Sequence, residues 1–195
     1  MYKQIEFIIK GVAPLIMHNG ALSDPLNEFA KAMAPINAKK NKDKTDADRE
    51  QVARLEWFGG IYKNEDGRVV IPGVNLEGCI RDGGMKERLG PKFKAGLICE
   101  GDYPLEYEGP KDINKLWENG KFRDTRRVGL KGSSIQRTRP IFRNWSLKFV
   151  ANYLDEVLTK DQVVNATTVA GRLVGICDYT PRFGRFEIVE TKVLS

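Results

Sequence analysis

The sequence contains few of the residues that build metal centres and disulfide frameworks. Its 195 residues include three cysteines and one histidine. Cys79, Cys99 and Cys177 are widely separated and form no CxxC pair, which argues against a structural zinc site and against a disulfide framework. We interpret the three thiols as small packing residues and expect neither a metal nor a cofactor.

Long apolar runs are also missing. No stretch is long enough to span a bilayer, and the first residues alternate like a strand and lack the pattern of a signal peptide. There is no internal repeat, low-complexity tract, nucleotide-binding motif or nucleophile elbow. We therefore expect a cytoplasmic globular protein that makes no contact with membranes.

Basic residues are present in modest excess, with a net charge of +6, but they are unevenly distributed. One cluster is the segment 39–44, which contains Lys39 and Lys40. A second surrounds the arginines at 182 and 185. The third follows an acidic stretch and consists of Lys121, Arg123, Arg126, Arg127, Lys131, Arg137, Arg139 and Arg143. Such segregation favours a polyanionic partner, although a solvated basic face is the plainer alternative.

Hydrophobic periodicity predicts the secondary structure and the fold. Period-2 alternation indicates strands, and apolar residues at helical spacing with capping residues indicate helices. The resulting skeleton is strand 2–10, helix 74–89, strand 95–100, strand 145–153, helix 160–173 and strand 185–193. This βαββαβ order predicts an α+β, ferredoxin-like (RRM-like) domain with an antiparallel sheet and both helices on one face.

Two insertions interrupt this skeleton within a single predicted domain, 1–195. Residues 20–71 are expected to form helices and a hairpin, with a capping box at Thr45 and Asp48 starting one of the helices. Residues 101–144 are expected to carry a basic hairpin whose arms are 126–131 and 134–142.

The segment from Gly175 to Phe186 has unusual backbone chemistry for a connection between a helix and a strand. Glycine allows main-chain amides to approach phosphates closely, and arginine binds phosphate in a bidentate manner. Arg182 and Arg185 are therefore predicted to bind a nucleic acid, with Tyr179 stacking on an unpaired base. The alternative is a simple turn in which the aromatic residues pack in the core.

Two motifs resemble the RAMP superfamily, the repeat-associated RNA-binding proteins of CRISPR systems. The first is the G-x(8)-G-R-F pattern of 175–186, which resembles the family's glycine-rich loop before the last strand. The second is IPGVNLEGCIRDGG, 71–84, which is similar to the entry of the first helix in backbone subunits of CRISPR effector complexes. The loop departs from the family in containing Cys177-Asp178-Tyr179 where related loops are richer in glycine.

This resemblance implies roles for particular residues. Arg81 would lie on the helix beside the bound strand, and the hairpin 126–143 would stand where the family has its thumb. It also implies partners: single-stranded RNA or DNA, further copies along the strand, or other CRISPR-type subunits. A stand-alone or phage-encoded relative fits the sequence equally well.

An enzymatic function has two candidate residues. His18, the single histidine, lies in a loop after the first strand, where some RAMP endoribonucleases place a general base. Asp24 is a candidate for metal-assisted cleavage, although capping of a following helix explains it more simply. We expect a single-stranded nucleic-acid-binding protein that is not an enzyme. An endoribonuclease, or an interaction protein that mimics a CRISPR subunit, are the alternatives.

Overall fold

A computed structural model describes residues 1–130 and 133–194 of the chain, with side chains left out at positions 130, 133 and 134. The chain divides into two units. The first, which we call the core unit, comprises 1–15, 63–109 and 142–195. The second, the insertion unit, comprises 16–62 and 110–141. None of the helices in the described residues has the length and apolar character needed to cross a membrane.

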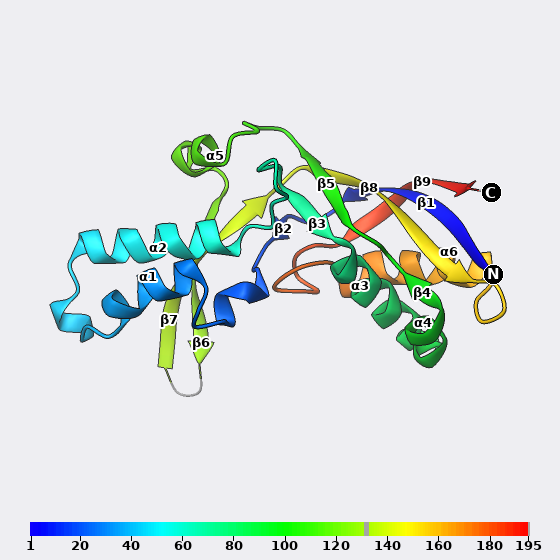
Figure 1. Ribbon diagram of the computed structural model, residues 1–195, viewed down its shortest axis with the longest axis horizontal. Helices are drawn as coiled ribbons and strands as arrows, with labels where there is room; N and C mark the ends of the chain where they lie inside the picture. Colours follow the sequence, from blue (N-terminus) through cyan, green and yellow to red (C-terminus); the bar gives the residue numbers. More distant parts are fainter. Residues whose placement is uncertain (131–132, 195) are drawn as a thin grey trace. The chain divides into compact units, whose positions relative to one another are not determined.

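The core unit is built on an antiparallel sheet (Figure 1). Strand β1 (Tyr2–Gly11) lies between β8 (Trp145–Leu154) and β9 (Phe186–Leu194), and β8 also pairs with β4 (Leu97–Ile98) and β5 (Asp102–Tyr107). Beyond β5 lies the short strand β3 (Val70–Pro72). The order β5-β8-β1-β9 is the ferredoxin-like arrangement that the βαββαβ pattern predicted.

Two principal helices connect these strands. Helix α3 (Gly73–Lys86) follows β3, and α6 (Lys160–Val169) follows β8 and continues into a π-helical turn, Ala170–Val174. A capping box of Thr159 and Gln162 begins α6. The two helices pack closely because Gly83 faces the α6 backbone: a Cβ there would lie 2.3 Å from the carbonyl oxygen of Ala166.

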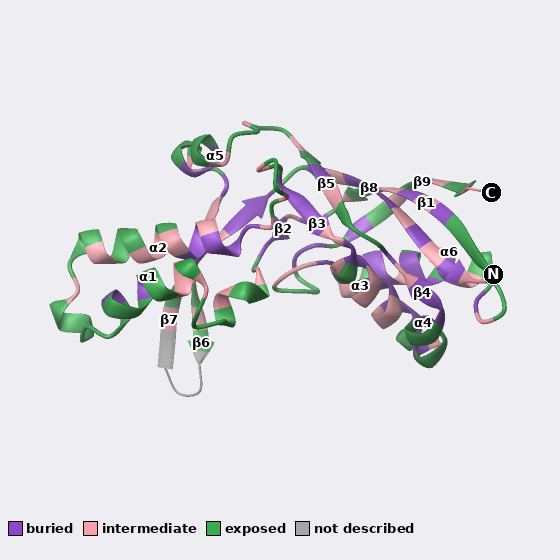
Figure 2. Ribbon diagram, viewed as in Figure 1, coloured by how far each residue is buried: buried purple, intermediate pink, exposed green. Residues whose placement is uncertain are grey.

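The core lies between the sheet and these helices. Ile5, Phe7 and Ile9 alternate along β1 as fully buried residues, and the rings of Phe7 and Phe149 stack at 5.2 Å. Helix α3 contributes Leu76 and other residues spaced at helical intervals. Figure 2 shows buried segments along β1, β3 and α6. Burial of alternate residues on strands and of one face on helices is the pattern from which the sequence predicted them.

In its described residues, the insertion unit combines three α-helices and a hairpin. The helices are α1 (Glu28–Asn37), α2 (Asp46–Gly60) and α5 (Ile113–Asn119), and the hairpin consists of β6 (Arg123–Leu130) and β7 (Ser133–Phe142). Strand β7 also pairs with the short strand β2 (Leu15–Ile16). Trp57 is fully buried and donates from Nε1 to the carbonyl oxygen of Phe122 at 2.8 Å, which ties α2 to the segment before β6.

Several predicted boundaries were wrong. The strand predicted at 95–100 begins only at Leu97, because the residues before it form a further helix, α4 (Gly90–Gly96). Pro91 lies in the first turn of this helix, where proline is tolerated. The expected hairpin between 61 and 71 is reduced to one bridge, Lys63 to Val69, since β3 pairs with β5 instead.

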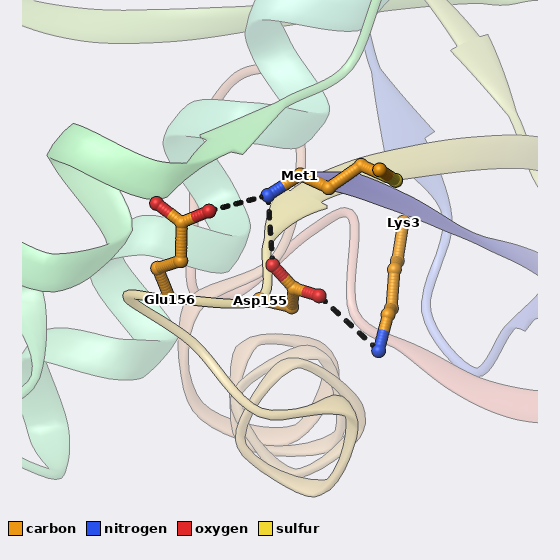
Figure 3. Close-up of polar contacts among 4 residues, drawn as sticks. All are labelled: Met1, Lys3, Asp155 and Glu156. Carbon is orange, nitrogen blue, oxygen red and sulfur yellow. Dashed lines mark hydrogen bonds and ion pairs between the residues drawn. The ribbon is translucent and has the colours of Figure 1, made fainter.

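A cluster of exposed ionic contacts joins the first residues of β1 to the loop after β8 (Figure 3). The amino group of Met1 donates to Asp155 at 2.9 Å and to Glu156 at 2.7 Å, and Lys3 pairs with Asp155 at 3.2 Å. Hydrogen bonding from the amino group, followed by that from Lys3, lowers the pKa of Asp155. The contacts reinforce the pairing of two neighbouring strands at one end of the sheet.

The close contact of α3 with α6 gives a matched pair of substitutions. Gly83→Ala should lower the free energy of unfolding by about 1–3 kcal/mol, because the new methyl group would collide with the α6 backbone. Gly78 lies on the same helix, and a Cβ built there would have its nearest neighbour, Nη2 of Arg81, at 3.9 Å. Gly78→Ala should therefore raise the free energy of unfolding by up to about 1 kcal/mol, because alanine has the higher helix propensity. Urea unfolding measures both values, and equal effects would contradict the packing argument.

Candidate nucleic-acid interface

The segment between the π-helical turn and β9, residues 175–185, is the most unusual backbone of the core unit; we call it the glycine loop. Gly175 and Gly184 have positive φ angles of 84° and 72°, and so do two residues with side chains, Cys177 at 65° and Tyr179 at 61°. The Thr180–Pro181 peptide bond is cis. A non-glycine residue in the left-handed region costs free energy and is more often found at functional sites.

The glycines allow the loop to fold tightly on itself. A Cβ at Gly184 would lie 2.0 Å from the carbonyl oxygen of Ile176, whose amide in turn donates to the Gly184 carbonyl at 3.0 Å. The Gly184 amide donates to Pro14 at 2.8 Å, and the Gly175 amide to Ala170 at 2.9 Å. These amides are engaged within the protein, so contact with a phosphate would depend mainly on side chains.

The aromatic residues of the loop divide into core and surface. Phe183 and Phe186 are buried, as the simple-turn alternative required of them. Tyr179 remains 40% exposed and rests edge-on against Phe183, with ring centroids 5.9 Å apart. Its ring is thus held by a buried neighbour while it stays accessible to a stacking partner.

Arg182 and Arg185, the loop arginines, are both exposed. Neither forms an ion pair with another residue of the described chain. Arg81 differs, because it pairs with the adjacent Asp82 at 3.1 Å; both side chains are nevertheless more than two-fifths exposed. The glycine loop therefore presents two exposed guanidinium groups that form no ion pair within the described residues.

Helix α3, the π-helical turn and the glycine loop together line an open pocket of about 460 Å³, which we call the loop pocket. Its lining residues are Asp82, Met85, Lys86, Leu173, Val174, Thr180 and Pro181. Met85 and Leu173 are largely exposed apolar residues. Arg81 precedes Asp82 and Arg182 follows Pro181, and both of these neighbours line the pocket. The structure therefore brings Arg81 and Arg182 to the same part of the core unit.

Two thiols lie where α3 meets the glycine loop. Cys79 donates from Sγ to the Gly175 carbonyl at 3.2 Å, and the amide group of Asn75 lies 3.8 Å from the sulfur of Cys177. Burial raises the pKa of Cys79 strongly and that of Cys177 to about 12. Cys99 is also buried, with its pKa raised to about 12, so all three free thiols stay protonated at neutral pH and serve packing, as predicted.

The basic hairpin holds two of its predicted binding residues in internal contacts. Arg126 and Arg137 face each other across β6 and β7. Arg126 pairs with Asp124, with Nη2 2.6 Å from Oδ1. Arg137 pairs with the buried carboxylate of Glu56 on α2, which also accepts from the Thr138 amide at 2.9 Å. Arg126 is therefore paired within β6, and Arg137 joins β7 to α2.

The other predicted residues of this segment have different settings. Arg127 and Arg143 are exposed, whereas Arg139 is half-buried. Arg127 and Arg139 belong to the insertion unit, and Arg143 to the core unit. Lys131 lies outside the described residues. Arg127 is therefore the hairpin residue whose exposure best suits contact with a strand.

The predicted lysines at the start of the basic segment 39–44 also differ from each other. Lys39 pairs with Asp48 at 2.7 Å, and Asp48 simultaneously completes the capping box of α2 with Thr45. Lys40 is exposed and precedes a 3₁₀ turn, Asn41–Asp43. The first lysine is thus part of the helix start, and the second is available to a partner.

The open face of the sheet does not resemble a stacking platform at its centre. Lys148 and Glu6 form an ion pair at 2.8 Å there, and the side-chain amides of Gln4 and Asn152 are bonded at 2.8 Å. RRM domains bind RNA on this face through aromatic residues on the central strands. Here the central strands carry polar side chains that are paired with one another.

His18, the candidate general base, has an exposed side chain in the insertion unit. Its carbonyl oxygen accepts a hydrogen bond from the Tyr62 hydroxyl at 3.0 Å, which fixes the backbone at this position.

Asp24, the candidate metal ligand, is exposed and accepts from the Leu26 amide at 2.8 Å. The expected helix cap is provided by Asn27, not Asp24, because α1 begins only at Glu28. Across the described part of the chain, no three His, Cys, Asp or Glu side chains converge in a way that could hold a metal ion.

Sequence reasoning missed two features of this interface. Glu56 was not singled out, although a carboxylate between Leu55 and Trp57 on an apolar helix face signals a buried acid that needs a partner. The sequence also did not predict that Met85 and Leu173 line the loop pocket, because they are 88 positions apart and meet only in the folded protein.

Comparison with known proteins agrees with this fold. The sequence matches no protein-family model and no curated protein. Among solved structures, the chain is similar to a chain in the cryo-EM structure of the Type III-B Cmr-beta bound to cognate target RNA, with a TM-score of 0.59 and 10% sequence identity. The match covers 100% of this chain and 61% of that chain, so this chain spans about three-fifths of the other's length. The similarity shows that the chain shares its fold with part of that chain.

The contact between Glu56 and Arg137 predicts a structural role for both. Glu56→Ala should lower the free energy of unfolding by about 1–3 kcal/mol, because it leaves the Thr138 amide without its acceptor and Arg137 without its partner. Arg127→Ala, on the exposed side of the same hairpin, is the control and should change stability by less than about 0.5 kcal/mol. Unchanged stability in Glu56→Ala would contradict this assignment.

The contact between Lys39 and Asp48 predicts a pH dependence. Hydrogen bonding from Lys39, followed by that from the Thr45 backbone, lowers the pKa of Asp48 from 3.8 to about 2. Because this pKa lies below that of the unfolded chain, the stabilisation is present above pH of about 4 and is lost as the pH falls toward 2.

Asp48→Asn should therefore lower the melting temperature at neutral pH, and its deficit relative to the unmodified protein should shrink between pH of about 4 and 2. Asp46→Asn removes a fully exposed carboxylate that pairs with Arg49 and should have the smaller effect. Thermal melts monitored by circular dichroism give both profiles, and a constant deficit across this pH range would exclude the proposed linkage.

Proposed function

We propose that the protein binds single-stranded RNA through the sugar-phosphate backbone, on the side of the core unit formed by the glycine loop and α3. The observation that carries this proposal is the exposure of Arg182 and Arg185 on the glycine loop, without ionic partners among the described residues. Arg182 directly follows Pro181, which lines the loop pocket. Guanidinium groups without an internal partner need not give up an existing contact in order to bind phosphate.

The fold supports the choice of ligand. One solved structure with a chain similar to this one is a complex bound to cognate target RNA. RNA is accordingly the preferred ligand, and single-stranded DNA is the alternative to be compared with it. Other CRISPR-type subunits, or further copies of this chain along the strand, are the partners that this arrangement suggests.

The proposed ligand contacts have distinct physical roles. Arg182 and Arg185 neutralise phosphates, and Arg81 contributes where its pairing with Asp82 permits. Tyr179 offers the exposed ring for stacking, worth about 1–3 kcal/mol per base in related interfaces. Arg127, Arg143 and Lys40 add exposed positive charge outside the loop. Because these contacts address phosphates and ring faces, sequence preference should be weak.

The salt dependence of binding tests the proposal. Affinity for a fluorescent single-stranded oligonucleotide should fall steeply with salt, because each neutralised phosphate releases counterions. The double variant Arg182→Ala/Arg185→Ala should reduce the slope of log K against log salt by about 1.4, which is roughly 0.7 for each lost contact with a single strand.

Arg49→Ala is the matched control, since it also removes an exposed positive charge but one that is already paired with Asp46. It should leave the slope unchanged. Fluorescence anisotropy titrations at several salt concentrations provide the data, with RNA and DNA of the same sequence compared directly. A flat salt response of the unmodified protein would eliminate backbone binding and favour an interaction protein that contacts other proteins.

A further inference from the structure

Strand β9 is the open edge of the sheet in the core unit. It pairs with β1 on one side, and no strand follows it in the sheet order of the described residues. It extends over nine residues, Phe186–Leu194, without proline or glycine. A long edge strand with free pairing groups is a template for another strand, and proteins usually shorten, charge or cover such edges.

The opposite edge of the sheet has different properties. Strand β3 contains three residues, Val70–Pro72, and its last residue lacks an amide proton. It therefore offers little surface for extending the sheet. A head-to-tail contact that joins β9 of one copy to β3 of the next is disfavoured, which leaves β9 with another β9 as the matching edge.

The side chains of β9 are consistent with a partner. Val189 is 61% exposed and Val193 is 49% exposed, although both lie in a strand of the central sheet. Glu190 and Lys192, which are also exposed, form no ion pair with another described residue. The edge thus carries two uncovered apolar side chains and two unpaired charges of opposite sign within five residues.

We propose that two copies of this chain associate by antiparallel pairing of their β9 strands about a two-fold axis at Thr191. In this register each residue faces the one equally far on the other side of Thr191. Glu190 then faces Lys192 of the second copy, and Val189 faces Val193, with each pair formed twice. Opposite charges and β-branched residues in facing positions are the favourable cross-strand pairs.

The contact is self-complementary and closes at two copies. It is therefore distinct from lining up along a nucleic-acid strand, which requires a head-to-tail contact elsewhere on the molecule. Strand β1 pairs Ile8 with Glu190 and Ile9 with Ile188, so Val189 is the extra residue of a bulge. This bulge ends the regular strand, so pairing about Thr191 is confined to the segment 189–193. An interface of this small size predicts a weak, concentration-dependent dimer.

Charge reversal tests this register directly. Glu190→Lys places lysine opposite Lys192 at two symmetric positions, and Lys192→Glu places two glutamates together. Each should weaken dimerisation by about tenfold or more. The double variant Glu190→Lys/Lys192→Glu restores both opposite-charge pairs and should recover the dissociation constant to within about threefold of the original.

Sedimentation equilibrium of the full chain after nuclease treatment measures the dissociation constant without any contribution from nucleic acid. Glu187→Lys is the control, because it makes the same charge change on the same strand outside the paired segment, and it should dimerise normally. Circular dichroism confirms that every variant is folded. A monomer throughout the accessible concentration range, single variants that dimerise normally, or failure of the double variant to recover would each overturn the proposal.

Discussion

The close approach of backbone to backbone at glycine is the constraint on which the core unit depends. A side chain would collide with main-chain atoms at several glycines, among them Gly83 against α6, Gly171 against the carbonyl oxygen of Phe186, and Gly184 against Ile176. Together they allow α3, α6 and the glycine loop to pack at backbone distance on one side of the sheet. The loop pocket, which these elements line, has its position because they pack so closely.

Neutralisation by neighbouring carboxylates decides which basic residues can serve binding. Arg126, Arg137 and Lys39 were predicted to contact nucleic acid, but each lies against an acid: Asp124, Glu56 and Asp48 respectively. They stabilise the hairpin and the start of α2. Arg182 and Arg185 have no such neighbour among the described residues, so their charge is available. The number of basic residues in a sequence cluster is therefore larger than the number of positive charges that remain unpaired in the folded protein.

The proposed functions use different parts of the core unit. The glycine loop and α3 offer an electrostatic surface for a sugar-phosphate chain, whereas β9 offers main-chain groups and a self-complementary pattern of side chains. Neither interaction requires the other, so in a dimer formed through β9 the glycine loop of each copy stays available. Two copies joined in this way would present two binding surfaces related by a two-fold axis, which suits a ligand that engages two strand segments.

The sequence by itself determined the order of the principal elements, because the alternation in β1 and β8 and the capping boxes at Thr45 and Thr159 are local signals that the fold preserves. It also identified the glycine loop and the buried role of the thiols. Only the tertiary structure decided which arginines are paired, since Glu56 meets Arg137 across 81 positions of the chain. The loop pocket and the open β9 edge likewise arise from contacts between segments that are distant in the chain. Such contacts produce no periodic pattern of residues, so the sequence alone does not reveal them.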